Sequence, residues 1–342
     1  MLEDDVTSSR RPVFLRALRA AVGRAPLWLL AWLVPLLLGL ALVGPWFTWF
    51  GDRLAHAYAP KSVLGSMDVV FRQDQAGALD TLRQGSGATT AILALVAMLA
   101  GVFLGGGWLQ VFLERTSGHS VRRFLWGGGK YFWRFLRVWV LTLLTITAFA
   151  WIVYGWPWDT LLELLLGASS MEELEVVRSE WTAVWAVWIQ DGLFALLFAL
   201  TMTWGDYTRT RLALHNGYSS LWAGLCTWFL LFAHPLRTLR PHALLFGLEV
   251  LVVYLLGRWS WGVNAELGPE SAWTAVLLLF LVGQVALLWQ SISRGARYAA
   301  AVQVSRALVA PLAQPDPWAS RIGGPGGPQY PIDDTDDYGV SI

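Results

Sequence analysis

The chain has 342 residues, of which 56% are hydrophobic and 14% are charged. This composition, with a mean hydropathy of +0.49, is typical of a protein whose main solvent is lipid, and it excludes an ordinary cytosolic enzyme. A net charge of +1 gives no global indication of nucleic-acid binding, and a single cysteine, Cys226, excludes an intrachain disulfide.

Six apolar stretches are long enough to cross a bilayer, because about 30 Å of hydrocarbon needs roughly 20 helical residues at about 1.5 Å each. Backbone amides in hydrocarbon have to be satisfied within their own segment, so these stretches are predicted helices. The predicted spans are residues 26–50, 88–113, 131–154, 182–204, 242–261 and 271–292. The sequence therefore predicts an all-α, polytopic transmembrane helical bundle, with a membrane domain over residues 26–310.

A seventh apolar stretch, residues 219–233, decides the topology. Its 15 residues reach only about 22 Å as a helix, which is less than the hydrocarbon thickness. Arginines lie on both sides of it, at Arg209 and Arg211 before it and at Arg237 and Arg240 after it. Because cytoplasmic segments hold the excess of Lys and Arg, both ends are expected in the cytoplasm. We interpret the stretch as a re-entrant or interfacial helix.

The distribution of positive charge predicts the orientation. With six spans and the N-terminus inside, the inner segments hold 19 of the 25 Lys and Arg residues and the outer segments hold 6. This bias predicts a multi-pass membrane protein with both termini in the cytoplasm. A cleaved signal peptide is the alternative for the first stretch, but an apolar run of about 24 residues exceeds the usual 7 to 15, so an uncleaved span is favoured.

The N-terminal segment, residues 1–25, is amphipathic. Phe14, Leu15, Leu18 and Val22 fall on one face of a helix that has arginines toward its other face. This pattern predicts a short helix in the inner interface, drawn there by apolar burial and by anionic lipid. A plain positively charged topology anchor is the alternative.

The C-terminal segment, residues 311–342, is rich in Pro, Gly and Asp. It has too few apolar residues to bury a core, so we expect a disordered cytoplasmic tail. Such a tail is a candidate docking segment for a soluble protein partner, although a solubilising extension explains it equally simply.

A segment before the third span, residues 122–137, interleaves aromatic and basic residues, as is typical of the lipid headgroup boundary. Beside a span, this mixture favours lipid over nucleic acid. The glycines at 127–129 are predicted to form a flexible inner turn. The candidate lipid-headgroup contacts are Arg134, Arg137, Arg209, Arg211, Arg237 and Arg240.

No catalytic motif is present. Lys130 follows the glycine run, but the spacing of a phosphate loop and its Ser or Thr are missing. The five histidines are well separated and there is one cysteine, so no metal or cofactor site is predicted. We therefore do not expect an enzyme.

Polar residues at predicted membrane depth are the candidate site, because an ionisable side chain there costs at least about 2.5 kcal/mol unless it is partnered or neutral. Asp191 is predicted about 14 Å from the outer end of the fourth span, and Gln190 precedes it. Glu249 and Gln284 are predicted level with each other, so we expect a protonated Glu249 to hydrogen-bond Gln284. The functional interpretation is a proton or cation relay, and the structural one is polar contact between helices.

Two shorter patterns give further local expectations. Ala97, Gly101 and Gly105 recur every four residues in the second span, which predicts close helix packing. Ser170 and Glu173 have the spacing of a capping box, which predicts a helix that runs from there into the fourth span without a break.

Four strings together resemble one family: residues 129–137, 206–212, 234–239 and 294–308. In their order they are similar to uncharacterised bacterial six-span inner-membrane proteins, distantly similar to the membrane domain of some glycerophosphodiester phosphodiesterases. The resemblance covers roughly residues 12–310 and implies a six-span fold. It does not imply phosphodiesterase activity, because the catalytic domain is not in this sequence.

The resulting functional hypothesis is a non-enzymatic inner-membrane protein that contacts membrane lipids or serves as the membrane subunit or scaffold of a larger assembly. The alternative is a small transporter or permease subunit that uses Asp191 and Glu249.

Overall fold

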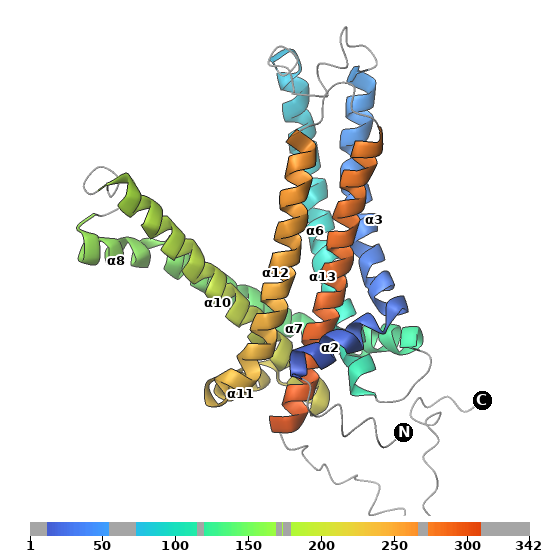
Figure 1. Cartoon of the computed structure of the whole chain (residues 1–342), viewed down its shortest axis with the longest axis vertical. Helices are drawn as coiled ribbons and strands as arrows, with labels where there is room; N and C mark the ends of the chain where they lie inside the picture. The colour runs from blue at the N-terminus through green and yellow to red at the C-terminus, as the bar shows by residue number, and fades with distance from the viewer. Residues whose placement is uncertain are drawn as a thin grey trace, which may run out of the picture. The chain divides into compact units, whose positions relative to one another are not determined.

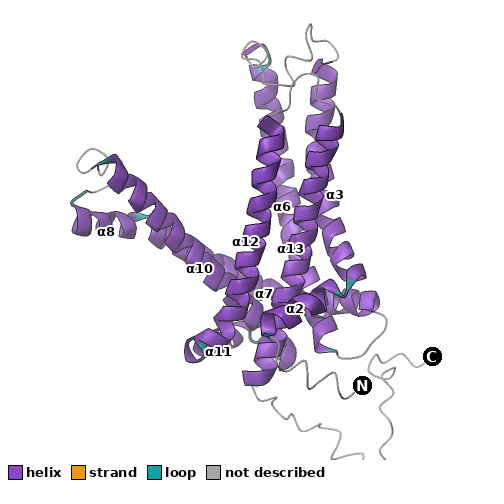
Figure 2. Cartoon of the chain, viewed as in Figure 1, coloured by secondary structure: helices purple, strands orange, loops and turns teal. Residues whose placement is uncertain are grey.

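The computed structural model describes residues 12–54, 73–114, 120–168, 173, 179–265 and 273–308. Every regular element in these ranges is an α-helix (Figure 2). Six of the described helices are long and apolar enough to cross a membrane, so the predicted fold class is confirmed: the chain is an all-α, multi-pass membrane protein. The six are α3 (Ala25–Leu54), α6 (Ala76–Leu113), α7 (Ser120–Tyr154), α10 (Glu180–Leu214), α12 (Pro235–Ala265) and α13 (Trp273–Leu308).

Several of these helices continue past the predicted inner ends of their spans. α7 begins at Ser120 rather than near 131, and α13 continues to Leu308 rather than ending near 292. The buried side chains lie mostly in and near these inner parts, and Trp108, Phe124 and Phe135 there have no exposed surface. The opposite parts of these helices expose many leucines and aromatic rings, as expected of surfaces that face lipid. The well-packed core therefore lies at the predicted inner ends of the helices.

A close helix contact joins α6 to α7 at glycines, and it corrects one prediction. The glycines at 127–129 form no turn, because they lie inside α7. A Cβ on Gly106 would lie 2.7 Å from the carbonyl oxygen of Gly127, and a Cβ on Gly127 would overlap Gln110. Only glycine allows the two backbones to approach this closely.

A short helix, α8 (Trp156–Leu166), follows α7 and was not predicted (Figure 1). Gly155 separates the two helices in an extended conformation, and a Cβ at this position would overlap the carbonyl oxygen of Trp151. Pro157 in the first turn favours the new start. Gly167 then ends α8 in the left-handed region, with φ of 72°.

The predicted unbroken helix from Ser170 into the fourth span is wrong. α10 begins at Glu180, and Ser179 before it is fully extended. The hydroxyl of Ser179 accepts a hydrogen bond from the backbone N–H of Thr182 at 3.3 Å, so the helix is capped here instead.

The N-terminal segment contains α2 (Val13–Val22), as its amphipathic pattern predicted. Of the predicted apolar face, Phe14 and Leu18 pack beside the fully buried Ala17 and Ala21, whereas Leu15 and Val22 are exposed. The two alanines pack with Ala296, Ala299 and Ala300 of α13 and with Leu245 of α12. Small side chains on both helices bring α2 close to α13.

The seventh apolar stretch forms α11 (Ser220–Ala233), capped at its start by the hydroxyl of Ser219. His234 interrupts the helical conformation before α12 begins at Pro235. The predicted tail, residues 311–342, lies outside the described residues.

Candidate functional site

Glu249 is in contact with two side chains of α13, neither of which is Gln284. Its carboxylate accepts a hydrogen bond from the hydroxyl of Ser293 at 2.7 Å and pairs with the guanidinium of Arg297. Gln284 instead accepts a hydrogen bond from the indole N–H of Trp32 at 3.1 Å. The predicted Glu249–Gln284 bond is therefore wrong, because α13 continues past the predicted end of the sixth span and brings a cation to the carboxylate.

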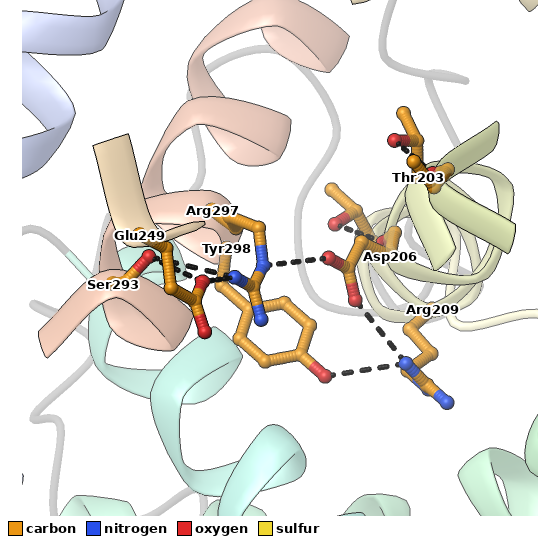
Figure 3. Close-up of polar contacts among 9 residues, drawn as sticks. Thr203, Asp206, Arg209, Glu249, Ser293, Arg297 and Tyr298 are labelled. Atoms are coloured by element: carbon orange, nitrogen blue, oxygen red, sulfur yellow. Dashed lines mark hydrogen bonds and ion pairs between the residues drawn. The ribbon is translucent and has the colours of Figure 1, made fainter. Parts of the chain in front are cut away.

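Arg297 extends this contact to α10 (Figure 3). Its Nε lies 3.8 Å from Oδ2 of Asp206, and Oδ1 of Asp206 lies 3.2 Å from Nη1 of Arg209. Arg209 in turn donates a hydrogen bond to the hydroxyl of Tyr298 at 3.3 Å. We call these residues, with Ser293 and Glu249, the charged network. Asp206 and Arg209 are three residues apart on α10, a spacing that allows two side chains of one helix to pair.

The charged network is largely buried. The side chains of Asp206, Arg209 and Arg297 are only 10 to 13% exposed, and that of Glu249 is 19% exposed. Two carboxylates face two guanidinium groups, so the charges of the network balance. Removing an ion from water costs roughly several kcal/mol, which a well-placed opposite charge can offset. Loss of one charged member of the network should therefore destabilise the fold.

Aromatic rings close the network on two sides. The guanidinium of Arg297 lies 4.4 Å from the centroid of the Phe246 ring. Tyr207 donates a hydrogen bond to the carbonyl of Thr238 at 3.0 Å, and its ring packs at 4.8 Å on the buried His242. These contacts come from α10, α12 and α13, and they hold the three helices in register beside the ion pairs.

A cavity of about 260 Å³ adjoins the network between α3, α6, α12 and α13. Glu249 and Arg297 reach it from the network, and Arg294 reaches it from the next turn of α13. Its other lining residues are Ala31, Val34, Pro35, Leu38, Ala97, Gly101, Leu104, Leu287, Gln290 and Ser291. The cavity is thus charged at one side and mostly apolar elsewhere.

Two glycines of α6 make room for α13 beside the cavity. A Cβ on Gly101 would lie 3.5 Å from the guanidinium nitrogens of Arg294, and a Cβ on Gly105 would lie 2.7 Å from the hydroxyl of Tyr298. The four-residue repeat predicted close packing, which is found at Gly105. The repeat did not reveal that polar side chains, those of Arg294 and Tyr298, occupy the space beside these glycines.

Asp191 and Gln190 lie at the other end of α10, away from Glu249. Asp191 accepts a hydrogen bond from the hydroxyl of Tyr154 at 2.8 Å, and Gln190 donates one to the carbonyl of Val153 at 2.7 Å. Since Tyr154 is the last residue of α7, Asp191 is level with the end of that helix and its side chain is exposed. The depth of Asp191 in the membrane stays a prediction.

The six candidate lipid-contacting arginines have different surroundings. Arg209 belongs to the charged network and is buried. Arg134 donates a hydrogen bond to the side chain of Asn216 at 2.6 Å and stacks over the Tyr218 ring, and Arg137 donates to the Tyr218 carbonyl at 3.5 Å. Arg211 is half-buried, whereas Arg237 and Arg240 are exposed.

α11 presents a large apolar face beside these arginines. Its exposed residues recur at helical spacing: Leu221, Trp222, Leu225, Phe229 and Phe232. The opposite face packs on α10, where the indole N–H of Trp204 donates a hydrogen bond to the carbonyl of Gly224 at 2.8 Å and the ring stacks on Trp228. Over the residues that the structure describes, no group of three or more His, Cys, Asp or Glu side chains is placed to hold a metal ion.

Sequence reasoning identified Glu249 but missed Arg297, Tyr298 and Arg294. These three follow the sixth span, where arginines were interpreted as topology anchors. Comparison of the chain with protein-family models, curated proteins and solved structures finds no match.

Proposed function

We propose that the chain is a non-enzymatic protein of the bacterial inner membrane that contacts lipid at the inner leaflet, either alone or as the membrane subunit or scaffold of a larger assembly. Both termini are on the cytoplasmic side in this proposal, and α11 enters the membrane without crossing it. The resemblance to six-span inner-membrane proteins is part of the same proposal.

One observation carries it: both ends of α11 lie against the same ends of the neighbouring helices. The hydroxyl of Ser220, at its start, donates a hydrogen bond to the carbonyl of Arg134 at 3.5 Å. Just after its end, Thr238 accepts a hydrogen bond from Tyr207. Arg134 and Tyr207 both belong to predicted inner ends, whereas the two ends of a spanning helix would lie about 30 Å apart in depth.

The surface of α11 supports lipid as its contact. Its exposed face is apolar, and Arg237 and Arg240 follow it on the exposed surface. A helix with one apolar face and neighbouring guanidinium groups suits the boundary between acyl chains and anionic headgroups.

Cysteine labelling tests the orientation. In a Cys226→Ala background, single cysteines at the exposed positions Asn216 and Arg237 flank α11, and one at Arg258 serves as the outer control. We expect a membrane-impermeable maleimide to label Asn216→Cys and Arg237→Cys only from the cytoplasmic side, and Arg258→Cys only from outside. Opposite sidedness of the first two positions would contradict the proposal.

Lipid retention tests the function. We expect native mass spectrometry in mild detergent to find anionic phospholipid bound to the unmodified chain, and less of it on the Arg237→Ala, Arg240→Ala double variant. The Arg258→Gln variant removes one exposed arginine at the far end of α12 and is the matched control. Equal retention by the double variant and the control would contradict lipid contact at this surface.

The second candidate function, a transporter or permease subunit, is favoured by the position of Glu249 on the wall of a cavity. A relay is disfavoured because Glu249 pairs with Arg297, while Asp191 contacts Tyr154 at the other end of α10. A pH-dependent flux into proteoliposomes that Glu249→Gln abolishes would favour transport over lipid contact.

A further inference from the structure

We infer that the cavity between α3, α6, α12 and α13 binds the phosphate group of a phospholipid through Arg294, with the acyl chains leaving along α3 and α13. This inference rests on the proposed function, because it assigns a specific lipid site to a lipid-contacting protein. The site is distinct from the α11 surface and can be tested separately.

The charge of the cavity selects an anion. Glu249 and Arg297 are paired with each other, and the remaining charges of the network, Asp206 and Arg209, also balance. Within the part of the chain that the structure describes, no acidic side chain lies within ion-pair distance of Arg294. The cavity therefore carries one uncompensated positive charge, on a guanidinium whose planar donors match phosphate oxygens.

The small residues of α6 hold that guanidinium at the cavity. Arg294 lies against Gly101, where a Cβ would come within 3.5 Å of two of its nitrogens. Ala97, one turn away on α6, also lines the cavity. A larger side chain at either position would fill the space in which an anion meets Arg294.

The size and walls of the cavity favour the head of an amphiphile over a whole soluble metabolite. A volume of about 260 Å³ is below the roughly 300–1,000 Å³ typical of small-molecule sites, so a headgroup fits and a complete phospholipid does not. Leu38 and Leu287 form part of the wall. Leu37 of α3 and Leu281 of α13 are more than half exposed, which gives acyl chains an apolar surface to follow.

The predicted end of the sixth span, taken alone, gives this charge a depth near the headgroups. Arg294 lies two residues beyond the predicted inner end of the sixth span, a distance of about 3 Å along a helix. Leu287 is about two turns farther toward the hydrocarbon. A lipid of the inner leaflet would therefore place its phosphate beside Arg294 and its acyl chains beside Leu287.

The test is native mass spectrometry of the full chain in mild detergent with three added probes: phosphatidylglycerol, phosphatidylcholine with the same acyl chains, and inorganic phosphate. We expect the unmodified chain to retain one phosphatidylglycerol more tightly than phosphatidylcholine. We expect Arg294→Gln to weaken that retention about tenfold or more, and Ala97→Leu, which keeps the charge but fills the cavity, to weaken it as well. Arg258→Gln is the matched control and should bind as the unmodified chain does.

Each contrary result has a definite meaning. Unchanged retention in both Arg294→Gln and Ala97→Leu, or no retained lipid on the unmodified chain, overturns the inference. Displacement of the lipid by millimolar inorganic phosphate also overturns it, because the site would then take a soluble anion. If the Arg237→Ala, Arg240→Ala variant loses lipid while Arg294→Gln does not, the proposed function stands and this site falls. Melting temperatures of all variants separate lost binding from lost folding.

Discussion

Glu249 of α12 and Arg297 of α13 form a largely buried ion pair, and the same arginine also faces Asp206 of α10. One side chain thereby connects three helices that are distant in sequence. Because both carboxylates are largely buried, each depends on a guanidinium to remain charged at low cost.

Arg297→Gln should therefore destabilise the fold strongly. The change leaves Glu249 with only Ser293 and Asp206 with only Arg209, and removing one partner of a buried pair costs about 3–5 kcal/mol. Denaturant titration in detergent micelles measures the loss. Arg258→Gln, at an exposed arginine with no ion pair among the described residues, should change stability by less than about 0.5 kcal/mol.

The double variant Glu249→Gln, Arg297→Gln should be more stable than the sum of the single changes predicts. Once both charges of the pair are gone, no uncompensated carboxylate remains at Glu249, so the coupling should be at least about 1 kcal/mol. Strictly additive losses would show that the two side chains do not interact in the folded protein.

The glycine contact between α6 and α7 offers a matched pair of substitutions on one helix. Gly127→Ala places a methyl group against Gln110 and the backbone of Gly106, so we expect a loss of about 1–3 kcal/mol from overpacking. Gly129→Ala has nothing within 4 Å of the added methyl, and alanine is the better helix former by about 1 kcal/mol, so it should be neutral or stabilising. Thermal unfolding in detergent compares the two, and equal effects would argue against the close crossing.

The sequence was sufficient to predict the helical membrane fold, because hydropathy and segment length together identify helices that can span a bilayer. It was insufficient at the glycines of 127–129, since glycine is usual both in turns and at close helix contacts, and only the partner Gly106 distinguishes the two. It also missed the partner of Glu249. Whether Arg297 reaches that carboxylate depends on how far α13 continues and on which face of the helix Arg297 lies.

The Tyr154–Asp191 contact should contribute little to stability. Both side chains are exposed, so Tyr154→Phe should leave the free energy of unfolding nearly unchanged. Asp191→Asn keeps an oxygen that accepts from the tyrosine hydroxyl, and we expect unchanged unfolding and, if any flux exists, unchanged flux in proteoliposomes. A flux lost on Asp191→Asn without unfolding would restore the relay hypothesis for this carboxylate.

Docking of α2 on α13 can be tested with adjacent residues of one helix. Ala21 has no exposed surface and packs among the alanines of α13, whereas Val22, the next residue, is 48% exposed. Ala21→Leu adds three carbon atoms to a filled contact, so we expect a loss of about 1–3 kcal/mol and faster proteolysis within residues 12–22. Val22→Leu enlarges a side chain that faces outward and should leave both quantities unchanged. If the two variants behave alike, α2 is held by lipid alone, as its amphipathic sequence first suggested, and the alanine contact contributes nothing to its position.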